Sequence, residues 1–483
     1  MSDETNALAT LKQLAKKYEM DVSGGTVRRS SSRFCFGVEH GDYNGTQLFG
    51  VGTDRYIWIA YKPNNSGLVR LVSGNFEADG VITFEAGSVT APPEGGLSEE
   101  EGKSWSRFPR GVDFVLSKKG SYKLQQGFDA VVFGNIPGGG MSRSASLSVN
   151  LVLTMVELNK IKLGSDFEVV KLAQMVENEY VGSPCGLLDQ IMIYYAKDGM
   201  GTHYDPASDK ITYIPMGKSN DDVRIAALDT GTVRPGLEKS TYKVRRAECE
   251  ELVLLLQNKG YKLKSLADVK TPEEFAKIKA DVGKENPHLV KRLQYIFEAN
   301  TRFAQMIEAW QSGNMRAVGE MFRADGHGLR DLYQISGPQL ETMCDIARSV
   351  PGVLGERMLG GGDFGASGAL ILAEAETALR DAVKTSYPRS HPDFADDYAV
   401  HVCRMVQGIV EFPLDSPPKD SKQPAQQPPP APAQQPPPAP AKPDNKSGAQ
   451  ATSDGSNNGV LMFAIGAAVG AAAAFFLARN SKL

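Results

Sequence analysis

Three ionisable side chains lie close together in the segment FCFGVEHGDYNG, residues 34–45. Glu39, His40 and Asp42 are followed by Tyr43-Asn44-Gly45, whose Asn-Gly step is typical of a turn. Two carboxylates and an imidazole at this spacing could hold a metal ion, activate a water molecule or bind the hydroxyls of a polyol. Taken alone, the segment favours a solvated turn, because charged residues beside Asn-Gly are usually on the surface.

A glycine-rich segment, VVFGNIPGGGMSRSASLSVNLVLTMVELN (131–159), has the order expected of a phosphate site: an apolar strand, a tight turn, small hydroxyl residues and a long helix. Glycines let backbone N–H groups approach an anion, hydroxyls donate hydrogen bonds, and the helix N-terminus is positive. The residues concerned are Gly138, Gly139, Gly140, Ser142, Ser144 and Ser146. The pattern is neither GxxxxGK[ST] nor GxGxxG, and a plain Gly-Ser loop is the alternative.

Size and composition indicate a globular protein. The chain has 483 residues with 41% hydrophobic and 23% charged residues, enough for about two to three domains. A net charge of -4 gives no reason to expect nucleic acid as a partner. The five cysteines are scattered and never form CxxC, which argues against a zinc site or a disulfide framework and for a reducing compartment.

The chain divides into parts of different composition. The N-terminal residues have no apolar leader, and the spacing of Leu8, Leu11 and Leu14 predicts a short amphipathic helix. Strand and helix patterns alternate to about residue 415. A proline-rich stretch then carries the unit PAQQPPPA twice, at 424–431 and 432–439. It predicts a disordered polyproline spacer of roughly 80 Å if fully extended, or else a docking site for proline-recognition domains.

Two features follow the spacer. Residues 460–478 (VLMFAIGAAVGAAAAFFLA) carry no charge and would span about 28 Å as a helix, which predicts a membrane anchor, although the many alanines weaken the drive for insertion. The chain ends in Ser481-Lys482-Leu483, which matches the tripeptide read by the peroxisomal import receptor. We therefore expect a peroxisome or glycosome, membrane-anchored, with the cytosol as the location before import.

Several segments together resemble those of galactokinases in the GHMP family of small-molecule kinases, in the family's order. SRFCFGVEHGDYNG is similar to the signature GRVNLIGEHTDYNGG, with Arg33, Glu39, His40, Asp42, Tyr43 and Asn44 in register. The others are the phosphate loop in GFDAVVFGNIPGGGMSRSASL, then MVENEYVGSPCGLLDQ, STYKVRRAECEEL, LRDLYQISGPQLETM and ERMLGGGDFGASGAL.

The resemblance implies a two-domain α+β or α/β fold of the GHMP kinase type, with the active site between the domains. The expected parts are a lead-in (1–27), an N-terminal kinase domain (28–220), a C-terminal kinase domain (221–415), the spacer (416–458), a transmembrane helix (459–479) and the targeting tail (480–483).

The resemblance also implies the reaction, in which the γ-phosphoryl group of ATP moves to the anomeric hydroxyl of galactose to give galactose 1-phosphate. Asp189 would accept the hydroxyl proton, with Arg33 as its partner, because a guanidinium keeps a carboxylate ionised. ATP would contact Gly138, Gly139, Gly140, Ser142, Arg143, Ser144 and Ser146, and Mg2+ would bind Ser144 and Glu177. Sugar hydroxyls would contact Glu39, His40, Asp42, Gly186 and Tyr242.

Alternatives remain open within this resemblance. The sugar could be N-acetylgalactosamine, arabinose or galacturonic acid, although a uronic acid would set its carboxylate near Glu39, and like charges repel. A catalytically weak galactose sensor is another possibility. The chain departs from the family at Cys35 and Val38 in the signature, at Arg143 in the phosphate loop, and at Asp363, which we expect to point away from the phosphates.

Overall fold

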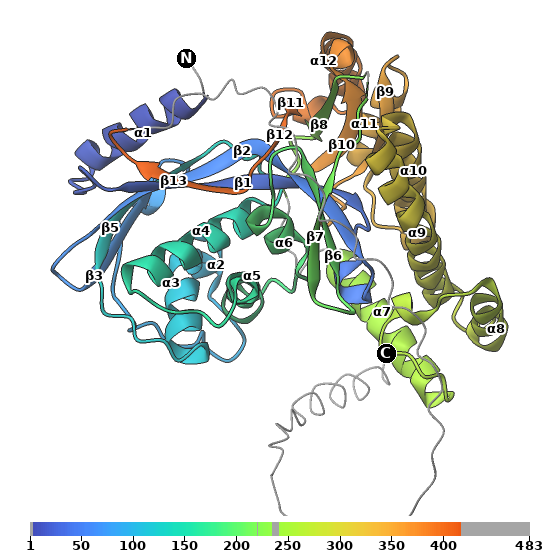
Figure 1. Ribbon diagram of the computed structural model, residues 1–483, viewed down its shortest axis with the longest axis horizontal. Helices are drawn as coiled ribbons and strands as arrows, with labels where there is room; N and C mark the ends of the chain where they lie inside the picture. The colour runs from blue at the N-terminus through green and yellow to red at the C-terminus, as the bar shows by residue number, and fades with distance from the viewer. Residues whose placement is uncertain (1–2, 220, 234–240, 417–483) are drawn as a thin grey trace, which may run out of the picture. The chain divides into compact units, whose positions relative to one another are not determined.

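The computed structural model describes residues 3–219, 221–233 and 241–416, all within the unit Met1–Ala425 (Figure 1). The predicted spacer, the apolar stretch 460–478 and the Ser481-Lys482-Leu483 tail lie outside the described residues. In the part of the chain that is described, no helix is both long and apolar enough to cross a membrane.

The larger of two sheets contains nine strands within the described ranges. Its main path runs β13-β1-β2-β5-β3-β4, and β2 also pairs with β6 and β12, while β7 pairs with β6. β3 and β5 run parallel, and the other pairs are antiparallel. The strands are β1 Thr26–Gly37, β2 Leu48–Pro63, β3 Leu68–Ser73, β4 Ile82–Glu85, β5 Phe128–Gly134, β6 Met200–Asp205, β7 Lys210–Pro215, β12 Met405–Val406 and β13 Ile409–Pro413.

Helices cover both faces of this sheet (Figure 1). The predicted N-terminal helix is confirmed as α1, whose Leu8, Leu11 and Leu14 pack with Trp58 on one face. The strand-turn-helix order of the glycine-rich segment is confirmed by β5 and α4, and α4 packs on β1 and β2 from the opposite face. The helices of this first half of the chain are α1 Asp3–Lys17, α2 Glu99–Lys103, α3 Arg107–Phe114, α4 Arg143–Leu158, α5 Asp166–Met175 and α6 Leu188–Tyr194.

The second sheet has the order β11-β8-β10-β9. Alternation along β8 gives it two apolar faces, because successive strand residues point to opposite sides. Ile225 and Ala227 join the main core, whereas Ala226 and Leu228 pack with residues of α11 and α12. Its elements are β8 Val223–Asp229, β9 Val353–Met358, β10 Ala366–Leu372, β11 Ala399–Cys403, α11 Pro338–Arg348 and α12 Glu376–Ser390.

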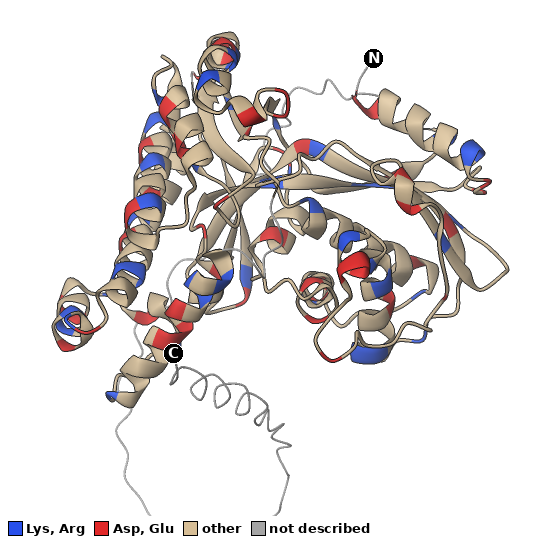
Figure 2. Cartoon of the chain, turned by 180° about the vertical axis from the view of Figure 1, so that it is seen from behind, with Lys and Arg blue, Asp and Glu red and all other residues tan. Residues whose placement is uncertain are grey.

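Four further helices complete the described part: α7 Thr241–Asn258, α8 Pro272–Val282, α9 Pro287–Ser312 and α10 Met315–Gly328. Figure 2 shows acidic and basic residues alternating along the outer surface of α9 and α10, which is typical of solvated helix faces. Short helical turns are η1 Asp42–Asn44, η2 Glu77–Asp79, η3 Val115–Lys119, η4 Val176–Val181, η6 Leu266–Asp268, η7 Leu329–Tyr333, η8 Ala373–Ala375 and η9 Pro392–Phe394.

The predicted boundary after residue 220 falls between β7 and β8, and so between the two sheets. The chain crosses back near its described end, because β13 pairs with β1 from Thr26↔Pro413 to Ser30↔Ile409. The edge of the first sheet is therefore built from segments almost 400 residues apart in the sequence. The domain limits themselves stay a prediction.

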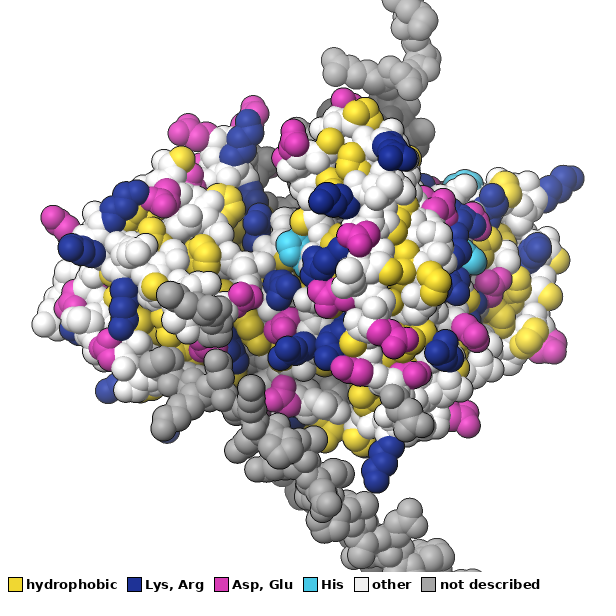
Figure 3. Space-filling model, turned by 90° about the horizontal axis from the view of Figure 1, so that it is seen from above, with side chains coloured by type: hydrophobic (Ala, Val, Ile, Leu, Met, Phe, Trp, Pro, Cys, Tyr) yellow, Lys and Arg dark blue, Asp and Glu magenta, His cyan; other side chains and the backbone are white. Residues whose placement is uncertain are grey.

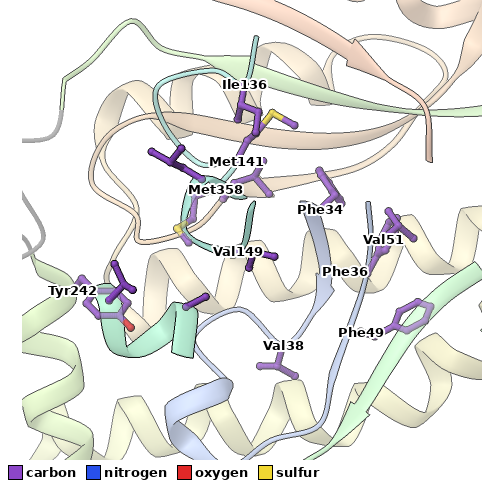
Figure 4. Packing of buried hydrophobic residues seen from close by; sticks show 14 of the residues in the cluster. Phe34, Phe36, Val38, Phe49, Val51, Ile136, Met141, Val149, Tyr242 and Met358 are labelled. Atoms are coloured by element: carbon purple, nitrogen blue, oxygen red, sulfur yellow. The ribbon is translucent and has the colours of Figure 1, made fainter. Parts of the chain in front are cut away.

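An aromatic cluster joins β1 to the long helices. Phe36 lies 5.1 Å from Phe34, 5.4 Å from Trp310 and 6.1 Å from Phe322, measured between ring centroids. Figure 4 shows the buried side chains of Phe34, Phe36 and Val38 along this segment. The packing fixes the end of β1, and with it the polar loop that follows.

Truncation of Leu11 tests whether α1 is part of the folded core. Leu11 is fully buried, so Leu11→Ala removes apolar contacts and leaves a cavity; we expect the free energy of unfolding to fall by about 2–5 kcal/mol. Urea denaturation of the full chain measures the change. Gln13→Ala on the exposed side of α1 is the control, with an expected change within about 0.5 kcal/mol. Equal stability of Leu11→Ala and the control would contradict the packing.

Candidate active site

A cavity of about 490 Å³ is lined by both halves of the described chain. The first sheet contributes Arg33 and the loop after β1, and its helices contribute the start of α4, the turn η4 and the start of α6. The second half contributes Thr232, Tyr242 and the loop between β9 and β10. Every predicted site residue except Ser146 lines this cavity.

Ser146 is a correction to the predicted phosphate contacts. Its side chain is fully buried in the first turn of α4, and its hydroxyl lies 2.8 Å from that of Ser30 on β1. Asn150, one turn further along, donates to the same Ser30 hydroxyl. Ser146 therefore faces the sheet under α4, because positions four apart on a helix share a face.

The phosphate loop has the geometry of an anion cradle. Ser142, the N-cap residue directly before α4, has a φ of 56°, and its buried hydroxyl has no hydrogen-bond partner among the described residues. A Cβ on Gly139 would lie 2.3 Å from the Cα of Gly365, so the loop meets the β9–β10 segment backbone to backbone. The first backbone N–H groups of a helix have no intrahelical partners, and the residues at this end of α4, Ser142 to Ser144, line the cavity.

The Arg33 guanidinium connects the predicted base to the phosphate loop. Its Nε donates to Asp189 Oδ1 at 2.7 Å, and Nη1 donates to the Gly140 carbonyl at 2.9 Å. Its Nη2 also lies 3.9 Å from Glu39 Oε1. Arg33 is 1% exposed, whereas the Asp189 side chain keeps 31% of its surface open. The carboxylate is thus held on one side and accessible from the cavity on the other.

The loop after β1 is buried, so the solvated turn that the local sequence favours is wrong. Glu39 is 3% exposed and His40 is 4% exposed, because α7, α9 and η7 cover the loop. Tyr295 on α9 donates to the backbone carbonyl of Glu39 at 2.8 Å. The acidic and imidazole groups are therefore fixed in orientation.

Asp42 and Gly186 are in tight contact. A Cβ on Gly186 would lie 1.9 Å from Asp42 Oδ2, so only glycine lets the two segments approach. Asp42 accepts hydrogen bonds from the backbone N–H groups of Tyr43 at 3.0 Å and Leu188 at 3.3 Å. The pKa of Asp42 is raised to about 6, mainly by burial and to a smaller extent by the negative charge of Asp189.

A hydroxyl network supports the wall of the cavity that His40 and Tyr242 line. His40 Nδ1 lies 2.9 Å from the Tyr43 hydroxyl, which lies 2.8 Å from the Tyr333 hydroxyl. The Tyr242 ring packs 5.4 Å from the His40 ring, between centroids. Tyr333 was not predicted as a site residue; it lies in LRDLYQISGPQLETM, where nothing in the spacing singles it out.

Glu177 and Ser144 offer oxygen ligands beside the phosphate loop. The Ser144 hydroxyl donates to Glu177 Oε2 at 2.9 Å, and Gln190 donates to Oε1 at 3.1 Å. The pKa of Glu177 is raised to about 7, mainly by burial and to a smaller extent by the negative charge of Asp189. No group of three His, Cys, Asp or Glu side chains that could hold a metal occurs in the described ranges. Two hard oxygens suit Mg2+, which usually completes its shell with water and substrate phosphates.

The departures from the family signature leave the polar groups in place. The Arg143 guanidinium lies 5.5 Å from the centroid of the Phe76 ring at the cavity wall. The Asp363 carboxylate accepts the backbone N–H of Thr241 at the start of α7, at 2.8 Å, and does not line the cavity, as expected. Cys35 and Val38 are buried among apolar side chains.

Comparisons with known proteins identify the family of the chain. Residues 110–197 match the GHMP kinases N terminal domain. The galactokinase of Lactiplantibacillus plantarum is 31% identical over 367 residues, covering 75% of this chain and 90% of the relative. That of Staphylococcus saprophyticus is 29% identical over 380 residues, covering 78% and 94%.

Solved structures show the same fold. The structure of Lactococcus lactis galactokinase complexed with galactose superposes with a TM-score of 0.74 at 28% identity, covering 83% of this chain and 98% of that one. Methanococcus jannaschii mevalonate kinase, at 15% identity, shares the fold alone, with a TM-score of 0.54. The predicted α/β fold of the GHMP kinase type is thereby confirmed, and the chain belongs to the galactokinases of the GHMP kinase family.

Proposed function

We propose that the protein transfers the γ-phosphoryl group of ATP to the anomeric hydroxyl of galactose, giving galactose 1-phosphate. The observation that carries this proposal is the Arg33–Asp189 pair, which lies in one cavity with the phosphate loop and the polar loop after β1. The galactokinase relatives support it as well, since the chain covers most of their length.

Asp189 is the proposed base. A sugar hydroxyl is a weak nucleophile, so a positioned carboxylate must accept its proton as the phosphoryl group is transferred. Arg33 holds Asp189 in place, because its Nε donates a hydrogen bond of 2.7 Å to the Asp189 carboxylate. The partly open face of Asp189 is where the anomeric hydroxyl would bind.

The phosphate loop is the proposed site for ATP. Gly138, Gly139 and Gly140, the Ser142 and Ser144 hydroxyls, and Arg143 line the cavity at the start of α4. Mg2+, held by Ser144 and Glu177 with the ATP phosphates, would offset negative charge on those phosphates. The glycines and the helix N-terminus orient the same phosphates through backbone N–H groups.

The loop after β1 is the proposed sugar site. Carboxylates at Glu39 and Asp42 can each accept hydroxyl hydrogen bonds, and a sugar with a wrongly oriented hydroxyl would leave a buried acceptor unpaired. His40, Gly186 and Tyr242 complete the wall. The buried carboxylate of Glu39, together with the partly buried carboxylate of Asp42, also favours a neutral sugar over a uronic acid.

We also propose, from the sequence alone, that residues 416–483 place the enzyme at a peroxisomal or glycosomal membrane. The support is the uncharged stretch 460–478 and the tail Ser481-Lys482-Leu483. A reporter protein that carries residues 416–483 at its C-terminus should stay in the membrane fraction on carbonate extraction. Deletion of Leu483 should abolish import of this reporter into peroxisomes. Release into the soluble fraction would contradict the anchor, and import without Leu483 would contradict the signal.

Replacement of Asp189 tests the proposed reaction. Asp189→Asn keeps the side-chain shape but cannot accept the proton, so we expect kcat to fall at least about 100-fold with the Kd for ATP nearly unchanged. ADP release with galactose, N-acetylgalactosamine, arabinose and galacturonic acid measures turnover. Asp166→Asn, an exposed carboxylate at the start of α5, is the control.

Two outcomes would overturn the assignment. Turnover of galacturonic acid but not galactose would contradict the proposed substrate. Calorimetric binding of galactose without ADP release by the unaltered protein would favour a sensor instead.

The raised pKa of Asp42 predicts a pH dependence. Below about pH 6 this carboxyl is protonated, where an ordinary aspartate is ionised, and it then cannot accept from all of its donors. We therefore expect kcat/KM for the sugar, at saturating ATP and Mg2+, to rise with pH through about 6 and then level off. Asp42→Asn should lower kcat/KM and flatten this limb. If kcat/KM of Asp42→Asn still rises with pH through about 6, a group other than Asp42 causes the rise.

A further inference from the structure

A second buried arginine, Arg357 on β9, contacts the sugar-site carboxylate. Its Nη1 donates to Glu39 Oε2 at 2.8 Å, and its Nη2 donates to the Cys35 carbonyl on β1 at 2.9 Å. Arg357 is 1% exposed, and its guanidinium lies 4.5 Å from the centroid of the Phe322 ring. It does not line the cavity.

Glu39 thus lies between two guanidinium groups, and one of them is closer to its carboxylate than the other. Oε2 is 2.8 Å from Arg357, whereas Oε1 is 3.9 Å from Arg33. The four charges alternate along the site in the order Arg357, Glu39, Arg33, Asp189. Because a buried carboxylate needs a close cation or donor, Glu39 without Arg357 would turn toward Arg33.

We propose that Arg357 is a positioning residue for the sugar site. By holding Glu39, it keeps one carboxylate oxygen available for a sugar hydroxyl and leaves the Nε of Arg33 to Asp189. The arginine comes from the second sheet, whereas Cys35 belongs to β1 of the first sheet and Glu39 to the loop that follows it, so the sugar site is complete only when both sheets are in place. This role rests on the proposed function, since it assigns Glu39 to the sugar.

Variants of Arg357 in the full chain test the role. Arg357→Met keeps an apolar stem over Phe322 but loses the hydrogen bonds to Glu39 and to the Cys35 carbonyl. We expect the calorimetric Kd for galactose to rise at least about tenfold. The Kd for ATP should change less than about twofold, because the phosphate loop keeps its contacts. Arg357→Lys should fall between, since an ammonium cannot reproduce the two-pronged contact with Glu39 and the Cys35 carbonyl.

Arg323→Met is the matched control. Arg323 on α10 donates to Oε2 of Glu356, the residue before Arg357 on β9, at 2.7 Å. Its replacement therefore also removes an arginine–carboxylate pair, but one that lies outside the cavity. A Kd for galactose as high in Arg323→Met as in Arg357→Met would overturn the proposal. An equal loss of galactose and ATP affinity in Arg357→Met would also overturn it.

If Arg357→Met does not fold, the double variant Arg357→Lys with Glu39→Gln is compared with the two single variants to test the role of Arg357. The two changes act on one contact, so their effects on the Kd for galactose should be clearly less than additive. Additive effects would contradict the proposal. These binding measurements need no turnover, so an inactive protein that still binds galactose would refute the kinase assignment while leaving the role of Arg357 measurable.

Discussion

The buried guanidinium of Arg33 is the contact on which the site depends. It reaches Asp189, the Gly140 carbonyl and Glu39, which belong to three segments far apart in the sequence. Burying a guanidinium is costly unless its N–H groups are paired, so the base, the phosphate loop and the sugar carboxylate must be placed together. β1 holds Arg33 in position because Phe34 and Phe36, on either side of Cys35, pack into the aromatic cluster.

The second constraint is the close approach of the two halves of the chain. Gly139 meets Gly365 backbone to backbone, and any larger residue at Gly139 would push the phosphate loop away from the β9–β10 segment. The face of the molecule that Figure 3 shows carries interspersed charges of both signs, so the described residues form no broad field of one sign on that face. Under the proposed function, recognition depends on the short-range contacts inside the cavity.

Local patterns predicted the elements well, and the site only in part. The leucine spacing of α1 and the strand-turn-helix order around the glycines were confirmed because each follows from neighbouring residues. The burial of Glu39 was missed, since the tyrosine and helices that cover it come from beyond residue 240. Ser146 was misassigned because alternate small residues at a helix start face opposite ways, one toward the cavity and one toward Ser30. Arg357 lies in the segment ERMLGGGDFGASGAL that resembles the family, but nothing in the spacing singles it out, and an arginine in a strand normally points to solvent.

The departures at Cys35 and Val38 concern packing rather than polar recognition. The Cys35 carbonyl accepts from Arg357, a bond that any residue can provide, while its side chain packs with Leu188 and Ile191 of α6, the helix that carries Asp189. An asparagine amide at this place would need hydrogen-bond partners, whereas a buried thiol packs as a small apolar group. The place behind the base is therefore apolar in this chain, and Arg33, Glu39 and Asp189 keep their mutual geometry through the guanidinium contacts and the packing of β1.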